Sequence, residues 1–393
     1  MVDTIMLATL GEETVGAVGL AAQFSSLLFA CHWGFIGGGM LFMAQYWGAR
    51  DDDGVCASYG LMLACIMLAG LIFSVMSVFF PGTVMRLYTD KEELWEIGIS
   101  YLRIVGFSYL LTVLATGISA MLRSTEFVRV PLYASTGSLF TNLLLNYLLI
   151  FGKFGFPRMG VRGAATATLI AGIVNILLLY ILGTWHKHPY ILRIRSHFRW
   201  TAAFVKEYLI KCFPIICNEL LIGVGNMVIS IVYGRQSTAA IAAVAVFQTF
   251  NAFVIGFFAG FTNAASVLVG KEVGAGNHEL AFARSKKMLI VTPATVFLAC
   301  MLFMCFKGHY LHAMNLSGES FEICGSMLLF FSFMGVVRMT NWLMNDTFRS
   351  AGDPVFGTVM EITFMYLMVL PLINFVGLKL KPENFMFVFM CAY

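Results

Sequence analysis

Long runs of apolar residues, each separated from the next by a short polar segment, dominate this sequence. A helix needs about 20 apolar residues to cross the ~30 Å hydrocarbon core of a bilayer, and within that core it must satisfy every backbone polar group internally. Ten runs meet this requirement, and two more are shorter. We therefore expect ten complete membrane-spanning helices at 15–47, 55–80, 94–122, 131–152, 162–185, 208–234, 239–271, 286–306, 320–347 and 355–377, and partial helices up to residue 10 and from about residue 384.

The pattern occurs twice in the chain, with an offset of 226 residues. The segment 16–51 recurs as 242–277 without a gap, and the same register continues to residues 123–124 and 349–350, so that it holds over about a hundred residues. Matching positions include Phe24 and Phe250, Gly48 and Gly274, Phe107 and Phe333, and Arg123 and Arg349. Chance similarity between apolar segments would not keep one register across several loops, so the repeat predicts two copies of one helix bundle.

The repeat also predicts the domain organisation. The second copy begins near Lys206, and counting back by the offset places about the first twenty residues of helix 1 before the start of this sequence. The partner of helix 162–185 would likewise extend past Tyr393. We predict an all-α polytopic membrane protein of two six-helix bundles (6+6), clipped in helix 1 and helix 12. Its parts are an N-terminal bundle 1–185, a basic cytoplasmic linker 186–205 and a C-terminal bundle 206–393. Because each copy holds an even number of spans, we expect a pseudo-twofold axis along the membrane normal.

The composition agrees with this class and excludes others. Hydrophobic residues make up 59% of the chain and charged residues only 12%, about half the charge of an average soluble protein. The nine cysteines show no CxxC spacing, which favours small core side chains over disulfides or metal ligands. No zinc signature, nucleophile elbow or phosphate-binding loop is found. We expect a protein that is not an enzyme and has no cofactor.

The loops carry the charges that predict orientation. If the 186–211 linker is cytoplasmic, fourteen Lys and Arg residues fall on its side and nine on the other. Cytoplasmic loops carry the excess of positive charge, so the linker is assigned to the cytoplasm, where it can contact anionic lipid. A nucleic-acid partner is not expected.

Ionisable groups inside a span are expensive, so each is a functional candidate by default. Asp3 lies in the incomplete first helix, where a capping role is the alternative. Glu219 follows Pro214 in FPIICNELLIGVG, and a proline there frees a carbonyl and bends the helix, which can open a polar cavity. Arg338 is the partner that we expect for Glu219. Asp346 and Glu361 lie near the cytoplasmic helix ends, where solvated or snorkelling charges are the default interpretation.

Several uncharged polar residues are further candidates. Asn142 and Asn146 are one helical turn apart and therefore share a face. They offer carbonyl oxygens to a cation or hydrogen bonds to neighbouring helices, and the sequence leaves both interpretations open. Gln23 and Gln248 are candidate cavity-lining residues, together with Arg338.

Several blocks together resemble one transporter family. RSTEFVRVP and the stretch 142–171, NLLLNYLLIFGKFGFPRMGVRGAATATLIA, are similar to the helix 4–6 signature of the multidrug and toxic compound extrusion (MATE) transporters. VDTIMLATLG, FPIICNELLIGVG, ASVLVGKEVGAGN and FRSAGDP resemble other recurring blocks of that family, in the same order. The resemblance covers essentially the whole chain.

The resemblance implies two lobes around a central cavity and export of amphipathic or cationic drugs in exchange for H⁺ or Na⁺. It implies cation coupling at Asp3, with Asn142 and Asn146 beside it, and at Glu219, with a Na⁺ site at Asp3 or Glu219. Asn146 and Arg338 stand where some members carry aspartates. We expect a monomer in a bacterial-type inner (plasma) membrane, with membrane lipid and small amphipathic substrates as partners. The alternatives are a lipid-linked precursor flippase of the same superfamily and an inactive truncated remnant.

Overall fold

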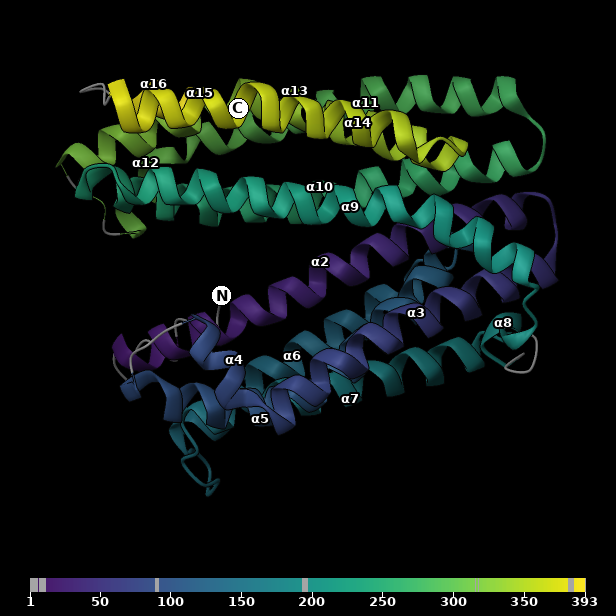
Figure 1. Cartoon of the computed structure of the whole chain (residues 1–393), viewed down its shortest axis with the longest axis horizontal. Coiled ribbons are helices and arrows are strands. Elements are labelled where there is room, and N and C mark those ends of the chain that lie inside the picture. Colours follow the sequence, from purple (N-terminus) through teal and green to yellow (C-terminus); the bar gives the residue numbers. More distant parts are fainter. Residues whose placement is uncertain are drawn as a thin grey trace. The chain divides into compact units, whose positions relative to one another are not determined.

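The computed structural model describes residues 12–88, 92–192, 197–314, 318–380 and 385–392, together with Met6 and Leu316. These residues are almost entirely helical and contain no strand (Figure 1). Ten of the described helices are long and apolar enough to cross a membrane, which confirms the ten complete helices expected from the sequence.

The long helices are joined by short connections that contain a few minor helices. In chain order the elements are α2 (Glu12–Gly48), α3 (Asp52–Phe79), α4 (Pro81–Tyr88), α5 (Glu92–Ser124), α6 (Arg129–Phe151), α7 (Val161–Trp185), α8 (Pro189–Leu192), α9 (Ala202–Gly234), α10 (Thr238–Gly274), α11 (His278–Cys305), α12 (Lys307–Ala313), α13 (Gly318–Ala351), α14 (Pro354–Phe364), the π-helix η2 (Met365–Val369), α15 (Leu370–Asn374), the π-helix η3 (Phe375–Leu380) and α16 (Phe385–Met390).

The chain forms two compact units. The first consists of Met1–Met43 and Asp51–Ile216, and the second of Ala44–Arg50 and Cys217–Tyr393. The end of α2 therefore packs within the second unit, and the first half of α9 within the first. The domain boundaries predicted from the repeat, at residues 185 and 205, stay a prediction.

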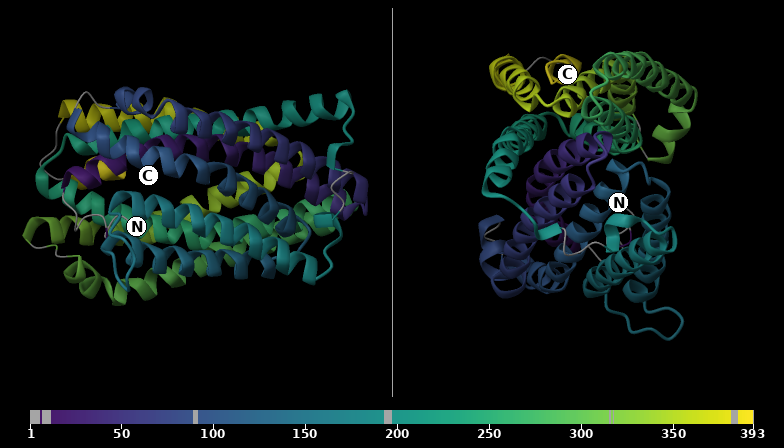
Figure 2. Two further views of the ribbon diagram at one scale, coloured as in Figure 1. Left: turned by 90° about the horizontal axis from the view of Figure 1, so that it is seen from below. Right: turned by 90° about the vertical axis from the view of Figure 1, so that its right-hand side faces the viewer.

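In the first unit, α3, α5, α6 and α7 run alongside one another (Figures 1 and 2). Small residues allow the close packing: Gly70 of α3 faces Val113 of α5, and Gly163 of α7 lies against the backbone of Leu149 in α6. Helix packing in a bilayer depends on such small residues, because lipid tails are as apolar as the helices and give little hydrophobic drive.

The linker after α7 folds back against the first unit. The Tyr190 hydroxyl donates to Asp52 Oδ1 at 2.6 Å, and the His197 ring lies edge-on against Tyr59. His188 is buried and its Nε2 lies 3.0 Å from the Thr125 hydroxyl. The described part of the basic linker is thus anchored by buried aromatic and histidine side chains.

The second unit has an aromatic core. The rings of Phe247 in α10, Phe331 in α13 and Phe389 in α16 are buried and meet edge to face. Phe250 adds a stacked contact with Phe303 of α11, with ring centroids 4.2 Å apart. Such pairs fix how the helices of this unit pack together.

Within the second unit, the ends of α2 and α10 touch backbone to backbone at repeat-equivalent positions. A Cβ atom on Gly48 would overlap the carbonyl of Lys271, and a Cβ atom on Gly274 would overlap the carbonyl of Gln45. Both glycines, and likewise Gln45 and Lys271, are related by the offset of 226 residues. The two copies of the repeat therefore contribute the same contact reciprocally.

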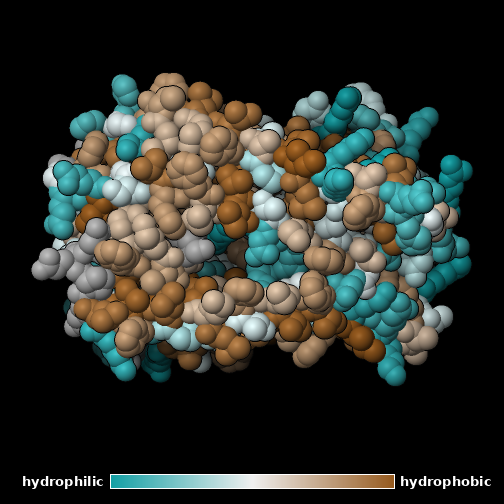
Figure 3. All heavy atoms as spheres, turned by 90° about the horizontal axis from the view of Figure 1, so that it is seen from above, coloured by the Kyte–Doolittle hydropathy of each residue, from teal (hydrophilic) through white to brown (hydrophobic). Residues whose placement is uncertain are grey.

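The outer faces of the helices are apolar. Exposed side chains include Leu132, Phe253 and Leu302, each more than 60% exposed. Figure 3 shows apolar residues over most of one face, with hydrophilic residues densest toward its right-hand end. Apolar surface on this scale is what lipid-facing helices present to a bilayer.

Candidate functional site

Glu219 lies inside the membrane-crossing helix α9, five residues after Pro214. Proline cannot donate the backbone hydrogen bond of that turn and its ring crowds the carbonyl of residue i−4, which here is Ile210. The helix is therefore weakened one turn before the carboxylate. The sequence indicated that Pro214 bends the helix beside Glu219, and the structure places both residues within the single helix α9.

The partner of Glu219 is Arg349, not Arg338 as we expected from the sequence. Arg349 Nη1 lies 3.4 Å from Glu219 Oε1 and 3.7 Å from Asp346 Oδ1. Arg349 is buried in the last turns of α13, although the sequence pattern placed it with the cytoplasmic loop charges. Arg338 precedes it by eleven residues, which is about 16 Å along a helix. Apolar patterning locates α13 but does not say which of its arginines stands opposite Glu219.

Glu361 of α14 is held by two amide side chains. Its Oε2 accepts a hydrogen bond of 2.9 Å from Asn218 Nδ2 of α9 and a second bond from Asn345 Nδ2 of α13. Asp346 is the neighbour of Asn345 and pairs with Arg349. The expectation that Asp346 and Glu361 are simply solvated charges near helix ends was therefore wrong, since both belong to a hydrogen-bonded set.

We call Asn218, Glu219, Asn345, Asp346, Arg349 and Glu361 the charged cluster. It joins α9, α13 and α14 inside the second unit and holds three carboxyl groups for one guanidinium. In the described part of the chain, no three His, Cys, Asp or Glu side chains converge as a metal site. With three carboxyl groups and one guanidinium, the charged cluster is short of positive charge.

Some buried polar atoms at the charged cluster have no hydrogen-bond partner. They are Oδ1 of Asn218, Oδ1 of Asn345 and the hydroxyl of Thr358, one turn before Glu361. Asn218 is 2% exposed and Asn345 6%. Asn345 Oδ1 packs directly against Gly357 of α14. Buried polar atoms are almost always paired, so these three atoms set the charged cluster apart from an ordinary helix contact.

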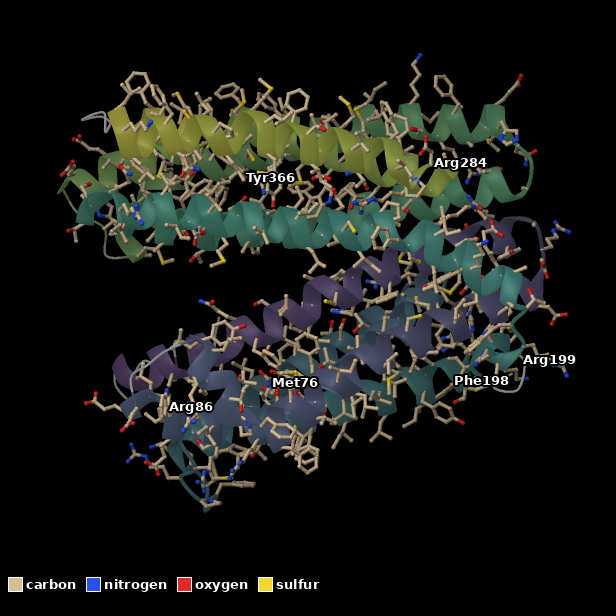
Figure 4. All side chains as sticks on the ribbon, viewed as in Figure 1. Met76, Arg86, Phe198, Arg199, Arg284 and Tyr366 are labelled. Carbon is tan, nitrogen blue, oxygen red and sulfur yellow. The ribbon has the colours of Figure 1, made fainter. Side chains whose placement is uncertain are left out.

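A second hydrogen bond ties α9 to the helix that carries Glu361. Tyr366, in the π-helix η2, donates its hydroxyl to the carbonyl of Leu221 at 2.9 Å. Tyr366 is labelled in Figure 4. π-helical turns are rare and occur frequently at functional sites. Here one begins four residues after Glu361, so the helix is irregular next to the charged cluster.

In the first unit, Asn142 and Asn146 of α6 bond to each other as their spacing predicts. Asn146 Nδ2 donates to Asn142 Oδ1 at 2.9 Å, and Asn142 Nδ2 lies 3.5 Å from the Thr168 hydroxyl of α7. Asn146 is completely buried. Asp3, which we expected beside them, lies outside the described residues. Cation coupling at these three positions stays a prediction.

The remaining candidates do not belong to the charged cluster. Gln23 on α2 and Gln248 on α10 are both exposed on their helices, and Arg338 is half-buried in α13. Their predicted role in lining a cavity stays a prediction.

Sequence reasoning missed most of the charged cluster. Arg349, Asp346 and Glu361 were interpreted as loop or helix-end charges, and Asn218 and Asn345 were not selected. One signal was present: Asp346 and Arg349 are three residues apart, so they share a helical face. Each of the two asparagines also directly precedes an acid, in Asn218-Glu219 and in Asn345-Asp346.

Comparison with known proteins adds an independent observation. The model of the MatE family matches residues 1–148 and 214–374. The transporter YisQ of Bacillus subtilis, itself described as uncharacterized, is 20% identical over 378 residues, which are 96% of this chain and 83% of that protein. "Probable multidrug resistance protein YoeA" of the same organism is 26% identical, over 90% of this chain and 77% of its own.

The fold also matches a solved structure. A multidrug resistance MATE family transporter of the MOP superfamily, in an outward-facing conformation, superposes with a TM-score of 0.87 at 18% identity. The match covers 100% of this chain and 86% of that one. At this identity the likeness concerns the fold, and it confirms the all-α fold class expected from the sequence.

Proposed function

Because this chain belongs to the MatE family of multidrug efflux transporters and is a multi-pass integral membrane protein, we propose that it is a secondary active antiporter. It exports amphipathic or cationic compounds while H⁺ or Na⁺ moves in the opposite direction. The observation that carries this proposal is the charged cluster, which places three carboxyl groups and one arginine among membrane-crossing helices.

Coupling requires that cation and substrate bias the same two-state equilibrium in opposite directions. A cation that binds Glu219 neutralises its charge and weakens its ion pair with Arg349, which links α9 to α13. Because α9 contains Pro214, the contact lies next to a weakened turn. Loss of the ion pair therefore changes how α9 packs against α13. Asp3, with Asn142 and Asn146, has the corresponding role in the first unit.

The test uses Asp3→Asn and Glu219→Gln in a host that lacks its own drug pumps, with ethidium efflux as the readout. The same variants are reconstituted in proteoliposomes under a Na⁺ gradient and then a pH gradient. Coupling energies in proteins commonly correspond to roughly 5–150-fold, so each variant should slow gradient-driven ethidium transport by about tenfold or more.

Glu207→Gln is the matched control, since Glu207 lies on α9 but is exposed and forms its salt bridge with Lys211 one turn along the same helix. It should transport ethidium at the wild-type rate. Unchanged coupling in both Asp3→Asn and Glu219→Gln would remove these residues from the mechanism. Absence of transport in the wild type under either gradient would contradict the antiporter itself.

A further inference from the structure

The first unit carries a charged groove at the beginning of α5, well away in the sequence from the charged cluster. The groove has a volume of about 690 Å³, within the range of roughly 300–1,000 Å³ that small-molecule sites occupy. All but one of its lining residues come from α5, and the remaining one comes from the first turn of α7, which packs against α5. We call it the boundary groove, and its charged and aromatic members are Glu92, Trp95, Glu96, Arg103 and Arg162.

The two arginines of the boundary groove mark one edge of the hydrocarbon core. Residues 104–122 of α5 contain no charged side chain, and neither do residues 163–185 of α7. At 1.5 Å per residue these runs are about 28 and 34 Å long, close to the ~30 Å core of a bilayer. Arg103 and Arg162 directly precede the two runs, so both guanidinium groups are expected at the depth of the lipid phosphates. Arginine binds phosphate well, because its planar fork of donors matches the phosphate oxygens.

The two glutamates of the boundary groove lie further from the core. Glu96 precedes Arg103 by seven residues and Glu92 precedes it by eleven, which places both on the same face of α5. Along the helix axis they are about 10 and 16 Å from Arg103, on its water side. All four charged side chains are exposed, and the salt bridges in the described part of the chain involve none of them. The groove therefore offers positive charge at phosphate depth and negative charge outside it.

A phospholipid with a primary ammonium group has the complementary order of charges. Its phosphate lies next to the glycerol, where Arg103 and Arg162 can bind it, and its ammonium lies further out, where it donates hydrogen bonds to carboxylates. Phe107, one turn after Arg103 and 55% exposed, gives an acyl chain an apolar surface. A quaternary ammonium is recognised by aromatic faces, but Arg86, labelled in Figure 4, already lies over the Trp95 ring, 4.9 Å from its centroid. An anionic headgroup would bring negative charge to the two carboxylates.

We propose that the boundary groove binds a zwitterionic phospholipid with a primary ammonium group, of the phosphatidylethanolamine class. The groove lies at the start of α7, and the basic linker follows the other end of that helix. Because the linker is expected in the cytoplasm, the lipid belongs to the outer leaflet. The proposal goes beyond the proposed antiport, since it requires only that the chain spans a bilayer.

Native mass spectrometry of the purified full chain tests this with phosphatidylethanolamine, phosphatidylglycerol and phosphatidylcholine that carry identical acyl chains. In pairwise competition the wild type should retain phosphatidylethanolamine over both other lipids. The double variant Glu92→Gln/Glu96→Gln should lower the ratio of bound phosphatidylethanolamine to phosphatidylglycerol by about two- to fivefold, the effect of an exposed ion pair. Arg103→Gln/Arg162→Gln should weaken the binding of both lipids by about the same factor, because both carry the phosphate.

Glu93→Gln and Arg158→Gln are the matched controls, since both residues are exposed near the same helix ends but do not line the groove. Both should keep the lipid preference of the wild type. An unchanged ratio in Glu92→Gln/Glu96→Gln, or an equal change in the controls, would overturn the proposal.

A soluble headgroup separates a lipid site from a site for small zwitterions. Excess glycerophosphoethanolamine should not displace the bound lipid, because it lacks the acyl chains, and complete displacement would contradict the proposal. If a double variant does not fold, its two single variants carry the same test, and thermal denaturation identifies such a case. Because the readout is lipid binding, failure of ethidium transport would reject the proposed function and leave this proposal to be judged separately.

Discussion

Arg349 compensates two carboxyl groups at once, so the charge balance of the charged cluster depends on it. It is 8% exposed and lies 3.4 Å from Glu219 and 3.7 Å from Asp346. Removing one partner of a buried ion pair is far more costly than the net contribution of the pair, because the other charge is left buried and unpaired. Replacing Arg349 should therefore lower the free energy of unfolding.

Arg349→Met should lower the free energy of unfolding by about 3–5 kcal/mol, as breaking a buried ion pair does. Thermal denaturation in detergent or a urea titration measures it. Combining Arg349→Met with Glu219→Gln should recover part of the loss, because the amide no longer carries an uncompensated charge. The coupling expected from such a double-mutant cycle is about 0.5–3 kcal/mol.

Arg235→Met is the control, because Arg235 is exposed in the turn after α9. It should change the stability by less than about 0.5 kcal/mol. If the losses from Arg349→Met and Glu219→Gln were strictly additive, the two residues would not interact as the 3.4 Å contact indicates.

His188 makes the first unit sensitive to acid. It is buried, its Nδ1 has no partner, and burial lowers its pKa to about 4 from an ordinary value of 6.5. The unfolded chain therefore binds more protons than the folded chain between these two values. As the pH falls through this window, the free energy of unfolding should decrease, and it should be insensitive to His188 above pH 6.5.

The measurement is the unfolding midpoint at several pH values between 7 and about 4.5. His188→Gln, which keeps a polar group near the Thr125 hydroxyl but cannot titrate, should flatten this dependence. His309→Gln is the control, because His309 is exposed. Equal pH dependence in the wild type and in His188→Gln would show that other groups destabilise the protein in acid.

The sequence identified the important acid of α9 but not its surroundings. A glutamate after a proline within an apolar run is visible in any window of the chain, so Glu219 was found. Its contact with Arg349 depends on the rotation and offset of α13 relative to α9. A membrane-spanning helix is apolar all round, because one side faces lipid and the other faces protein. Its hydrophobic periodicity therefore does not show whether a charged residue faces the lipid or a neighbouring helix.

At the scale of elements, hydropathy predicted the ten long helices within a few residues, except that α9 and α11 begin earlier than expected. It missed α4, α8 and α12, which are short and lie in segments that read as loops. The π-helices η2 and η3 were also missed. They lie on either side of α15, which contains Pro371, and local composition does not distinguish one extra residue in a turn.

The contact between α2 and α10 within the second unit gives a prediction at this scale. Gly274→Ala should be destabilising by about 1–3 kcal/mol or more, because its Cβ would overlap the carbonyl of Gln45 and backbone cannot move aside cheaply. Gly48→Ala should have a similar effect through Lys271, since the contact is reciprocal. Thermal denaturation of the purified variants measures both.

Gly260→Ala is the matched control on the same helix. A Cβ atom there meets nothing within 4 Å, so the substitution should be neutral or stabilise by up to about 1 kcal/mol through the better helix propensity of alanine. If Gly274→Ala were as well tolerated as Gly260→Ala, the two backbones would not approach as closely as the structure shows.

At the scale of the whole molecule, the distribution of Lys and Arg predicts how the chain is oriented in the membrane. The linker between α7 and α9 carries the densest group of basic residues, and cytoplasmic loops are enriched in them. The linker and the turn after α9 are separated by one membrane-crossing helix, so they must lie on opposite sides. Arg199 of the linker, labelled in Figure 4, is therefore expected in the cytoplasm, and Arg235 outside.

Single cysteines at these two positions test the orientation in intact cells, in a chain whose nine native cysteines are replaced by serine or alanine. Both positions are exposed, so both should react with a maleimide once it reaches them. A membrane-impermeant maleimide should label Arg235→Cys from outside and label Arg199→Cys only after the membrane is permeabilised. The reverse pattern would invert the orientation, so that the helix ends nearest the charged cluster would face the exterior. In that case a cation that enters from outside would meet the charged cluster close to its side of entry, whereas in the predicted orientation it must first pass most of the length of the helix 354–380, which carries Glu361.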